Sequence, residues 1–369
     1  MRVLMLSKAC IVGIYQKKLE AMAAQDPDLE LRVLVPPSWR DERGETKLER
    51  VYTHGYELIE TPIRFNGSYH LHYYPQFSDH LRQFQPHIVH VDEEPYNLST
   101  WLAMRTAKRA KLKAIFFSWQ NILRRYPPPF NAMERAVLQL ADYAIAGTES
   151  AAQVWRQKGY TGAIAVIPQF GVDPDLFHPR EFSKSNGIVQ IGYAGRLWHG
   201  KGLDLLIEAL AMIRDLEWVF HLVGSGPEKD KIYKLIHQKG LTERVQCQAW
   251  LPSTDMPDFM RQLDILVLPS RTLTSWKEQY GRVLIEAMSS QVAVVGSSSG
   301  AIPNVIEDSG LIFPEEDVIT LAAHLRRLIT EPTLRQKLGI QGRERVLKHF
   351  TQEQIATETV RVYHQLYQA

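Results

Sequence analysis

The sequence predicts an α/β protein built from two doubly wound, Rossmann-like domains that face each other across a cleft. The chain has 369 residues, which is too long for one ordinary core and indicates two domains of similar size. Short apolar runs alternate with helix-period segments, which favours parallel sheets covered by helices on both faces. A segment rich in Pro, Gly, Asp and Ser near residues 173–187 interrupts the alternation and is typical of a linker.

The first half of the chain is predicted to form one such domain, over residues 1–175. Its near-continuous apolar runs read as buried strands. These runs lie at 3–6, 31–35, 88–91, 114–117 and 143–147. Helix-period patterns at 97–111 and 131–141 lie between several of them.

The second half repeats the alternation, and its domain is predicted to cover residues 186–350. Strands are expected at 189–195, 219–226, 245–250, 265–270 and 292–300. Helices are expected at 202–213, 229–240, 256–263 and 281–288. A last helix at 351–369 carries Ile355, Val362 and Leu366 on its apolar side, and we expect it to pack back on the first domain.

Composition excludes several classes of protein. The net charge of +2 is too close to zero for wholesale nucleic-acid binding. Cys10 and Cys247 lie far apart, so they form neither a disulfide framework nor a CxxC metal site, and a reducing, cytoplasmic location is expected. No apolar run approaches about 20 residues, so no transmembrane helix is expected. Attachment to a membrane surface stays open.

Two cations flank a predicted strand-to-helix turn in "GYAGRLWHGKG", residues 192–202. Arg196 and Lys201 would stand at a helix N-terminus, where free N–H groups and the positive end of the helix dipole favour an anion. A guanidinium fork and an ammonium point charge together suit a diphosphate. The alternative is a pair of solvated surface cations.

Two glutamates, Glu278 and Glu286, stand eight residues apart in "WKEQYGRVLIEAM". Eight helical residues rise about 12 Å, too far for the paired carboxyls of a glycoside hydrolase. The two acids are therefore expected to hold different parts of one long ligand, with Gly281 permitting close approach and the nearby N–H groups meeting an anion. The alternative is a surface helix whose first-turn acid is favoured by the dipole.

These stretches together resemble the retaining GT-B glycosyltransferases of family 4, also called glycosyl transferases group 1. The resemblance rests on "GRLWHGKG", "LVGSGPE", "ILVLPS" and the Glu278–Glu286 spacing. It extends to "VIPQFGVDPDLFHP" in the linker and to "VVGSSSGAIPNVIEDSGLIFP" after it. It is weaker over residues 1–165.

The resemblance implies a catalytic set of Arg196, Lys201 and Glu278. The two cations would bind the donor diphosphate, and Glu278 would contact hydroxyls of the donor sugar. Further donor-binding residues would be Gly13, Gly195, Gly224, Gly226, Tyr280, Gly281, Arg282 and Glu286. The implied reaction moves a hexose from a UDP- or GDP-linked sugar to an acceptor hydroxyl with retention. It needs no metal or other cofactor. The leaving phosphate takes the acceptor proton on the same face.

Two places depart from the family pattern. Many members have a Gly-Gly pair in the first strand-to-helix loop, where this chain has only Gly13. Many also have a histidine at the position of Gln120, and an amide there can hydrogen-bond a hydroxyl but cannot act as an acid or base.

Acceptor-binding residues are expected in the first domain. The candidates are Glu93, Glu94, Gln120, Asn121 and Arg124. Carboxylates and amides bind hydroxyls, which suits a carbohydrate or glycolipid. The basic, aromatic stretch 121–130 also suits anionic lipid headgroups, which leaves peripheral contact at the inner membrane face open. His70 and His72 are too few to define a metal site.

The expected function is hexosyl transfer in the synthesis of a cell-surface polysaccharide or glycolipid. A nucleotide-sugar epimerase or phosphorylase of the same fold, and a non-catalytic nucleotide-sugar-binding subunit, are the alternatives. The presence of Arg196, Lys201 and Glu286 together speaks against them. The sequence leaves open the donor base and sugar, the acceptor and the oligomeric state.

Overall fold

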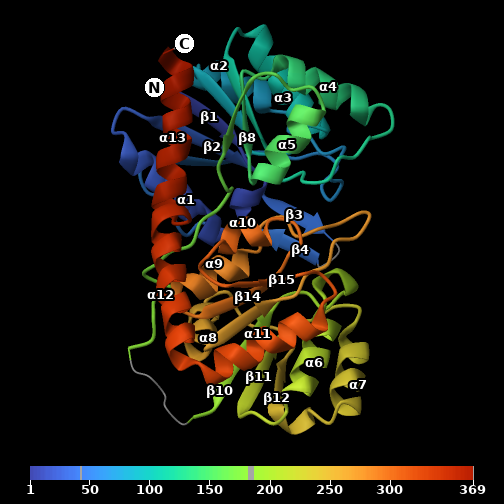
Figure 1. Ribbon diagram of the computed structural model, residues 1–369. Helices are drawn as coiled ribbons and strands as arrows, with labels where there is room; N and C mark the ends of the chain where they lie inside the picture. Colours follow the sequence, from blue (N-terminus) through green and yellow to red (C-terminus); the bar gives the residue numbers. More distant parts are fainter. Residues whose placement is uncertain (42–43, 182–186, 369) are drawn as a thin grey trace. The chain divides into compact units, whose positions relative to one another are not determined.

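The predicted two-sheet α/β architecture is confirmed by the computed structural model, which describes residues 1–41, 44–181 and 187–368 (Figure 1). The chain forms two compact units. The first unit contains Met1–Gly171 and Gln352–Ala369, and the second contains Val172–Thr351. The predicted linker near 173–187 includes residues 182–186, which lie outside the described residues.

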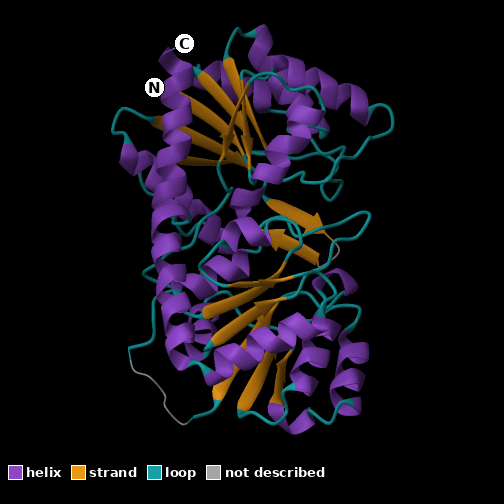
Figure 2. Cartoon of the chain, in the orientation of Figure 1, coloured by secondary structure: helices purple, strands orange, loops and turns teal. Residues whose placement is uncertain are grey.

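The first unit is built on a seven-stranded parallel sheet in the order β5-β2-β1-β6-β7-β8-β9. Its strands are β1 (Arg2–Leu6), β2 (Glu30–Val35), β5 (Glu57–Glu60), β6 (Ile88–Val91), β7 (Lys113–Ser118), β8 (Tyr143–Ala146) and β9 (Ala163–Val166). Its helices are α1 (Gly13–Gln25), α2 (Phe77–Phe84), α3 (Leu98–Arg109), α4 (Phe130–Leu140), α5 (Glu149–Gln157) and α13 (Gln352–Gln368). The central strands are apolar at nearly every position because helices cover both faces of the sheet (Figure 2).

An antiparallel pair, β3 (Ser38–Asp41) and β4 (Gly44–Lys47), accompanies this sheet and was not predicted. Its sequences, SWRD and GETK, show neither an apolar run nor a clear alternation of apolar and polar residues. In β4 every residue is exposed. Local pattern therefore carries no signal for this pair.

The last helix, α13, belongs to the first unit and packs along α1 (Figure 1). Ile355, Val362 and Leu366 are buried in that unit's core. On the same helix, the Tyr363 hydroxyl lies 2.7 Å from His90 Nδ1 on β6. The return of the chain to its first sheet is thus fixed by both apolar packing and a buried polar contact.

The second unit has a six-stranded parallel sheet in the order β12-β11-β10-β13-β14-β15. Its strands are β10 (Val189–Ala194), β11 (Trp218–Val223), β12 (Val245–Gln248), β13 (Ile265–Leu268), β14 (Ala293–Ser297) and β15 (Leu311–Phe313). Its α-helices are α6 (Leu203–Met212), α7 (Lys229–Gln238), α8 (Met256–Gln262), α9 (Arg282–Ser289), α10 (Ile302–Ile306), α11 (Val318–Thr330) and α12 (Pro332–His349). The strand order reverses at β10, between β11 and β13, and ligands of such sheets bind at the carboxyl edge beside that point.

Among the described helices, none is both long and apolar enough to cross a membrane.

Candidate active site

An ion pair joins the two motifs that the sequence singled out at the carboxyl edge of the second sheet. Lys201 ends the short 3₁₀ helix η2 (His199–Lys201) after β10, and Glu278 lies in the loop after β13. Lys201 Nζ donates to Glu278 Oε2 at 2.6 Å, and Ser270 Oγ donates to the same oxygen at 2.7 Å. The Lys201 side chain is 18% exposed and that of Glu278 is 9% exposed. A cation is therefore held in place at this edge, partly shielded from water.

Two tryptophans form an aromatic wall beside this cation. Lys201 Nζ lies 5.1 Å from the centroid of the Trp276 ring, within cation–π range. Trp276 in turn meets Trp198 edge to face, with ring centroids 4.8 Å apart. Gly200 fits between them because a Cβ there would lie 2.5 Å from Trp198 and 2.9 Å from Trp276. The wall limits where the ammonium group can move.

The two other charged candidates of the second unit's motifs are Arg196 and Glu286. Arg196 is exposed just after β10, and its carbonyl accepts a hydrogen bond from Tyr193 at 3.0 Å. Glu286, in the second turn of α9, is buried and pairs with Arg282, Nε to Oε1, at 2.9 Å. Burial raises the pKa of Glu286, and the Arg282 charge opposes that effect. The two glutamates thus hold separate positions with separate cationic partners.

Arg271 is an organiser of this site that the sequence did not reveal. It is 5% exposed and donates hydrogen bonds to both carboxylate oxygens of Asp204, at 2.6 and 2.8 Å. Its backbone N–H donates to the carbonyl of Gly200 at 2.8 Å, and its Nη1 donates to that of His199 at 3.1 Å. Burial acts to lower the pKa of Arg271, but the bonds to Asp204 and Glu316 raise it. Arg271 therefore fixes the turn that ends in Lys201.

Gly224 and Gly226 lie where the loops after β10 and β11 touch through their backbones. A Cβ on Gly224 would lie 1.9 Å from the carbonyl oxygen of Gly195, and one on Gly226 would lie 2.3 Å from that of Leu197. The Leu197 N–H also donates to the Ser225 carbonyl at 2.9 Å. This close approach explains the GxG pattern by itself.

Replacing Gly224 with alanine is expected to destabilise the second unit by about 3 kcal/mol, because the new methyl group meets backbone at a φ of +150°. Gly240→Ala is the matched control. Gly240 has a φ of +66° with nothing within 4 Å of its Cβ, so only about 1 kcal/mol of backbone strain is expected. Urea unfolding compares the two, and equal losses would contradict the proposed role of the backbone contact.

The remaining donor candidates of this unit lie at the start of α9. Gly281 is the residue before the helix and has a φ of +75°, a conformation that favours glycine. Tyr280 is buried, with its ring 6.2 Å from that of Phe350. The carbonyl of Glu278 accepts from the N–H of Ala301 at 3.1 Å, and a Cβ on Gly300 would lie 2.0 Å from that oxygen. The loop after β14 therefore supports Glu278.

Gly13, the donor candidate of the first unit, begins α1 and meets a carboxylate of its own chain. Its N–H donates to Glu49 Oε2 at 2.6 Å. A Cβ there would also lie 2.5 Å from Val51 Cγ2. Helix N-termini favour anions, and here Glu49 supplies one. A diphosphate approaching this N–H would have to displace it.

Glu93 is a buried acceptor candidate and sits in a closed polar network. Its carboxylate lies 2.6 Å from His72 Nε2 and accepts from Ser99 at 2.6 Å and Tyr74 at 3.0 Å. His72 Nδ1 faces the Ser68 carbonyl at 2.9 Å, so both ring nitrogens face acceptors, and an imidazolium–carboxylate pair satisfies every atom. Burial acts to raise the pKa of Glu93, but the His72 charge and these hydrogen bonds bring it below its usual range.

Glu94, Gln120 and Asn121 follow the neighbouring strands β6 and β7. Glu94 accepts from Ser118 Oγ at 2.5 Å and from the N–H of Trp119 at 2.8 Å. Gln120 is 6% exposed and its Oε1 accepts from Lys158 at 3.3 Å. Asn121 is 5% exposed, whereas Arg124 is exposed. The structure thus brings Glu94 and Gln120 to one sheet edge and leaves Arg124 toward solvent.

Glu94 is expected to make stability depend on pH. Burial raises its pKa from 4.5 to about 7, so between those values the folded state binds more protons than the unfolded chain. The stability associated with the protonated form is present below pH 4.5 and is lost as the pH rises through 7. Relative to Glu94→Gln, the wild type should lose on the order of 2 kcal/mol of unfolding free energy between pH 5 and 8.

Glu94→Gln is a suitable reference because its amide mimics the protonated carboxyl: the oxygen accepts from Trp119 and the NH₂ donates to Ser118. Urea unfolding at several pH values measures both proteins. Parallel pH curves would show that Glu94 does not titrate in this range.

No group of three or more histidine, cysteine, aspartate or glutamate side chains with metal-binding geometry occurs among the described residues.

Two protein-family models match the chain. "Glycosyl transferases group 1" matches residues 177–345, and "Glycosyltransferase Family 4" matches residues 20–176. Together they cover most of both units.

Curated relatives and solved structures agree with these matches. The MMP alpha-(1->4)-mannosyltransferase of Mycolicibacterium hassiacum is 28% identical, over 66% of this chain and 59% of the relative. The lipopolysaccharide core biosynthesis mannosyltransferase LpcC of Rhizobium leguminosarum bv. viciae is 26% identical, over 73% of this chain and 76% of the relative. The crystal structure of Anabaena Alr3699/HepE in complex with UDP matches with a TM-score of 0.73 and 18% identity, over 99% of this chain and 100% of that one. The chain spans 54–62% of the length of the first three curated relatives.

Proposed function

Because the chain belongs to the family 4 GT-B glycosyltransferases, we propose that it moves a hexose from a UDP- or GDP-linked sugar to a hydroxyl of a carbohydrate or glycolipid, with retention of anomeric configuration. The observation that carries the proposal is the partly buried contact between Lys201 and Glu278 at the carboxyl edge of the second sheet. It places a fixed cation and a hydrogen-bond acceptor side by side, as a sugar diphosphate requires. Two of the relatives are named as mannosyltransferases, and mannose is a hexose, which supports the proposed class of sugar.

In this proposal the residues of the second unit divide the donor between them. Lys201 and Arg196 bind the diphosphate and stabilise the negative charge that develops on the leaving group. Glu278 accepts hydrogen bonds from hydroxyls of the donor sugar, and Glu286 accepts hydrogen bonds from hydroxyls of the ribose. The leaving phosphate takes the acceptor proton on the same face, so the protein needs no nucleophile. Because Lys201 and Arg196 supply the positive charge, the reaction is proposed to need no metal.

The relatives also suggest a biological setting. Since one of them acts in lipopolysaccharide core synthesis, we place this protein in the assembly of a cell-surface polysaccharide or glycolipid. The acceptor would meet the first unit near Glu94, Gln120, Asn121 and Arg124. A cytoplasmic location, with peripheral contact at the inner membrane face, fits such an acceptor.

The first test is a thermal-shift panel of UDP, GDP, ADP, UDP-glucose and GDP-mannose, each with and without EDTA. A ligand at 100 times its Kd adds about 2.7 kcal/mol of stability. We expect one nucleotide class to stabilise the protein, unchanged by EDTA, and Lys201→Ala to weaken that effect. No stabilisation by any of the five would argue against the donor assignment, and a shift abolished by EDTA would argue against metal-independent binding.

A further inference from the structure

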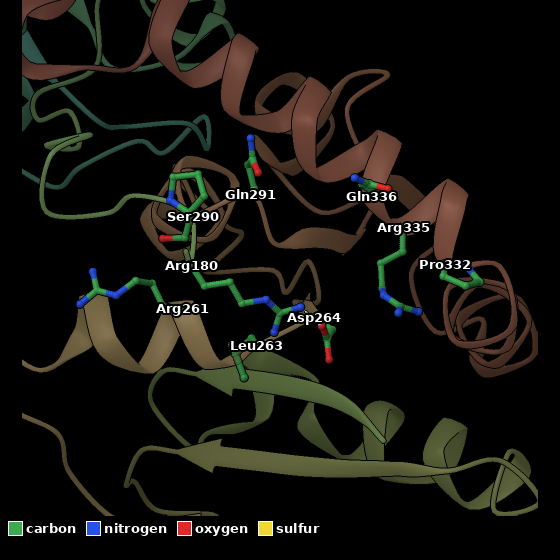
Figure 3. A pocket seen from close by; sticks show the side chains of 10 residues that line it. Arg180, Arg261, Leu263, Asp264, Ser290, Gln291, Pro332, Arg335 and Gln336 are labelled. Carbon is green, nitrogen blue, oxygen red and sulfur yellow. Dashed lines mark hydrogen bonds and ion pairs between the residues drawn. The ribbon is translucent and has the colours of Figure 1, made fainter. Parts of the chain in front are cut away.

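A charged cavity lies in the second unit, at the opposite edge of its sheet from Lys201 (Figure 3). Its volume is about 350 Å³. Of its lining residues, Asp264 directly precedes β13 and Gln291 lies two residues before the neighbouring strand β14. Pro332, which also lines it, is the first residue of α12. The cavity is therefore at the amino ends of the strands, whereas the candidate active site is at their carboxyl ends. We call it the arginine pocket, because Arg180, Arg261 and Arg335 all line it.

Positive charge exceeds negative charge in the arginine pocket. Among the described residues that line it, Asp264 is the one acid. Arg180 Nη2 donates to Asp264 Oδ1 at 2.5 Å, and the N–H of Gln190 donates to Oδ2 at 2.8 Å, so both carboxylate oxygens are engaged. Arg261 pairs with Asp258, outside the lining, and donates to the Leu176 carbonyl at 3.0 Å.

Arg335 supplies the excess charge. Among residues 1–41, 44–181 and 187–368, no carboxylate forms an ion pair with it. Its Nη1 donates to the Leu328 and Ile329 carbonyls at the end of α11, at 2.5 and 3.4 Å. In Figure 3 the Arg335 side chain reaches into the region that also holds Asp264 and the end of Arg180. Burial lowers the pKa of Arg335; the Asp264 charge acts to raise it and the Arg180 charge to lower it further.

Two repulsive effects act on the charge of Arg335, and its hydrogen bonds to the carbonyls at the end of α11 offset them in part. Arg335 stands in the first turn of α12, where the helix dipole disfavours a cation. A second guanidinium, that of Arg180, faces the same space. An anion between them would relieve both effects, and guanidinium forks match the geometry of phosphate oxygens.

We propose that the arginine pocket binds a phosphate group, either as the free anion or as part of a phosphorylated metabolite, at a site separate from the donor site, with Arg335 and Arg180 as its principal contacts. The volume is within the range of small-molecule sites and has room for more than the phosphate alone. Inorganic phosphate and a phosphorylated metabolite share this chemistry, and the experiment separates them.

The test is calorimetric titration with inorganic phosphate and with glucose 6-phosphate, in the Lys201→Ala protein so that the donor site contributes little. We expect saturable binding with one site per chain. Tighter binding of glucose 6-phosphate would assign the pocket to a phosphorylated metabolite, and equal or tighter binding of phosphate would assign it to the free anion.

Two variants locate the binding. Gln336 is exposed and lines the pocket, so Gln336→Glu adds a neutralising carboxylate with almost no change of shape. Gln336→Glu and Arg335→Gln should each weaken binding tenfold or more, since each removes or opposes a charge-assisted hydrogen bond. Arg327→Gln, which removes an equal charge from the exposed side of α11, is the control and should leave binding unchanged.

Arg335→Gln also loses the contacts with α11 and can unfold for that reason. Gln336→Glu removes no side-chain hydrogen bond or ion pair among the described residues, which keeps the test decisive. Binding that survives Gln336→Glu at wild-type strength would overturn the proposal. The absence of saturable binding by either probe would overturn it as well.

Discussion

Replacing Lys201 with alanine is expected to lower sugar transfer by about a thousandfold while the protein stays folded. Removing one fixed donor from a site that stabilises developing negative charge typically costs a factor of 10²–10³. Lys201 should lie at the upper end because it carries a full charge, is held by Glu278 at 2.6 Å and is partly shielded by Trp276. A thousandfold loss corresponds to about 4 kcal/mol of transition-state stabilisation.

The measurement is release of nucleoside diphosphate from whichever sugar nucleotide stabilises the wild type, followed as kcat/KM. Lys239→Ala is the matched control, because Lys239 also pairs with a glutamate, Glu208 at 2.5 Å, but away from the site. It should keep wild-type activity. Near-normal turnover by a stably folded Lys201→Ala protein would remove Lys201 from the phosphate-binding role.

The second large effect is expected at the buried pair of His72 and Glu93. Their side chains are 0% and 1% exposed, so His72→Ala leaves a carboxylate inside the first unit without its cation. Breaking a buried pair in this way typically costs 3–5 kcal/mol. Ser99 and Tyr74 still donate to Glu93, so we expect about 3 kcal/mol.

Urea unfolding followed by circular dichroism measures this loss, and a double variant identifies its cause. In His72→Leu/Glu93→Leu both charges are replaced by apolar side chains, and such replacements are often neutral or stabilising relative to the intact pair. The double variant should therefore be more stable than His72→Ala. If it is less stable, the loss arises from packing around Trp39 and Tyr74 rather than from the unpaired charge.

The two-sheet fold could be predicted because its strands are unusually apolar. The runs at 88–91 and 265–268 are buried at every position, and each coincides with a strand. The pair β3 and β4 could not be predicted, because its residues do not form part of an apolar face. Helix α12 was also missed: its apolar residues are few and follow no clear helical period.

The candidate site was predictable in its residues but not in its connections. Arg196, Lys201, Glu278 and Glu286 stood out by type and spacing, yet the pairing of Lys201 with Glu278 depends on two loops that follow different strands. Arg271 gave no signal, because an arginine after a strand is ordinarily solvated and only the tertiary fold buries it against Asp204. Likewise Glu93 was predicted to bind the acceptor, and no local pattern indicated that His72, on a distant loop, lies beside it.

The return of α13 to the first sheet sets an order of events during synthesis on the ribosome. The second unit is one contiguous stretch, so it can complete its core as soon as Thr351 has emerged. The first unit cannot, because Tyr363 and the apolar side of α13 fill its interior and are translated only after the second unit. The usual sequence, in which the N-terminal domain folds first, is therefore reversed. Until α13 has been synthesised, part of the apolar surface of residues 1–171 stays uncovered, and chaperone binding is expected to concentrate there.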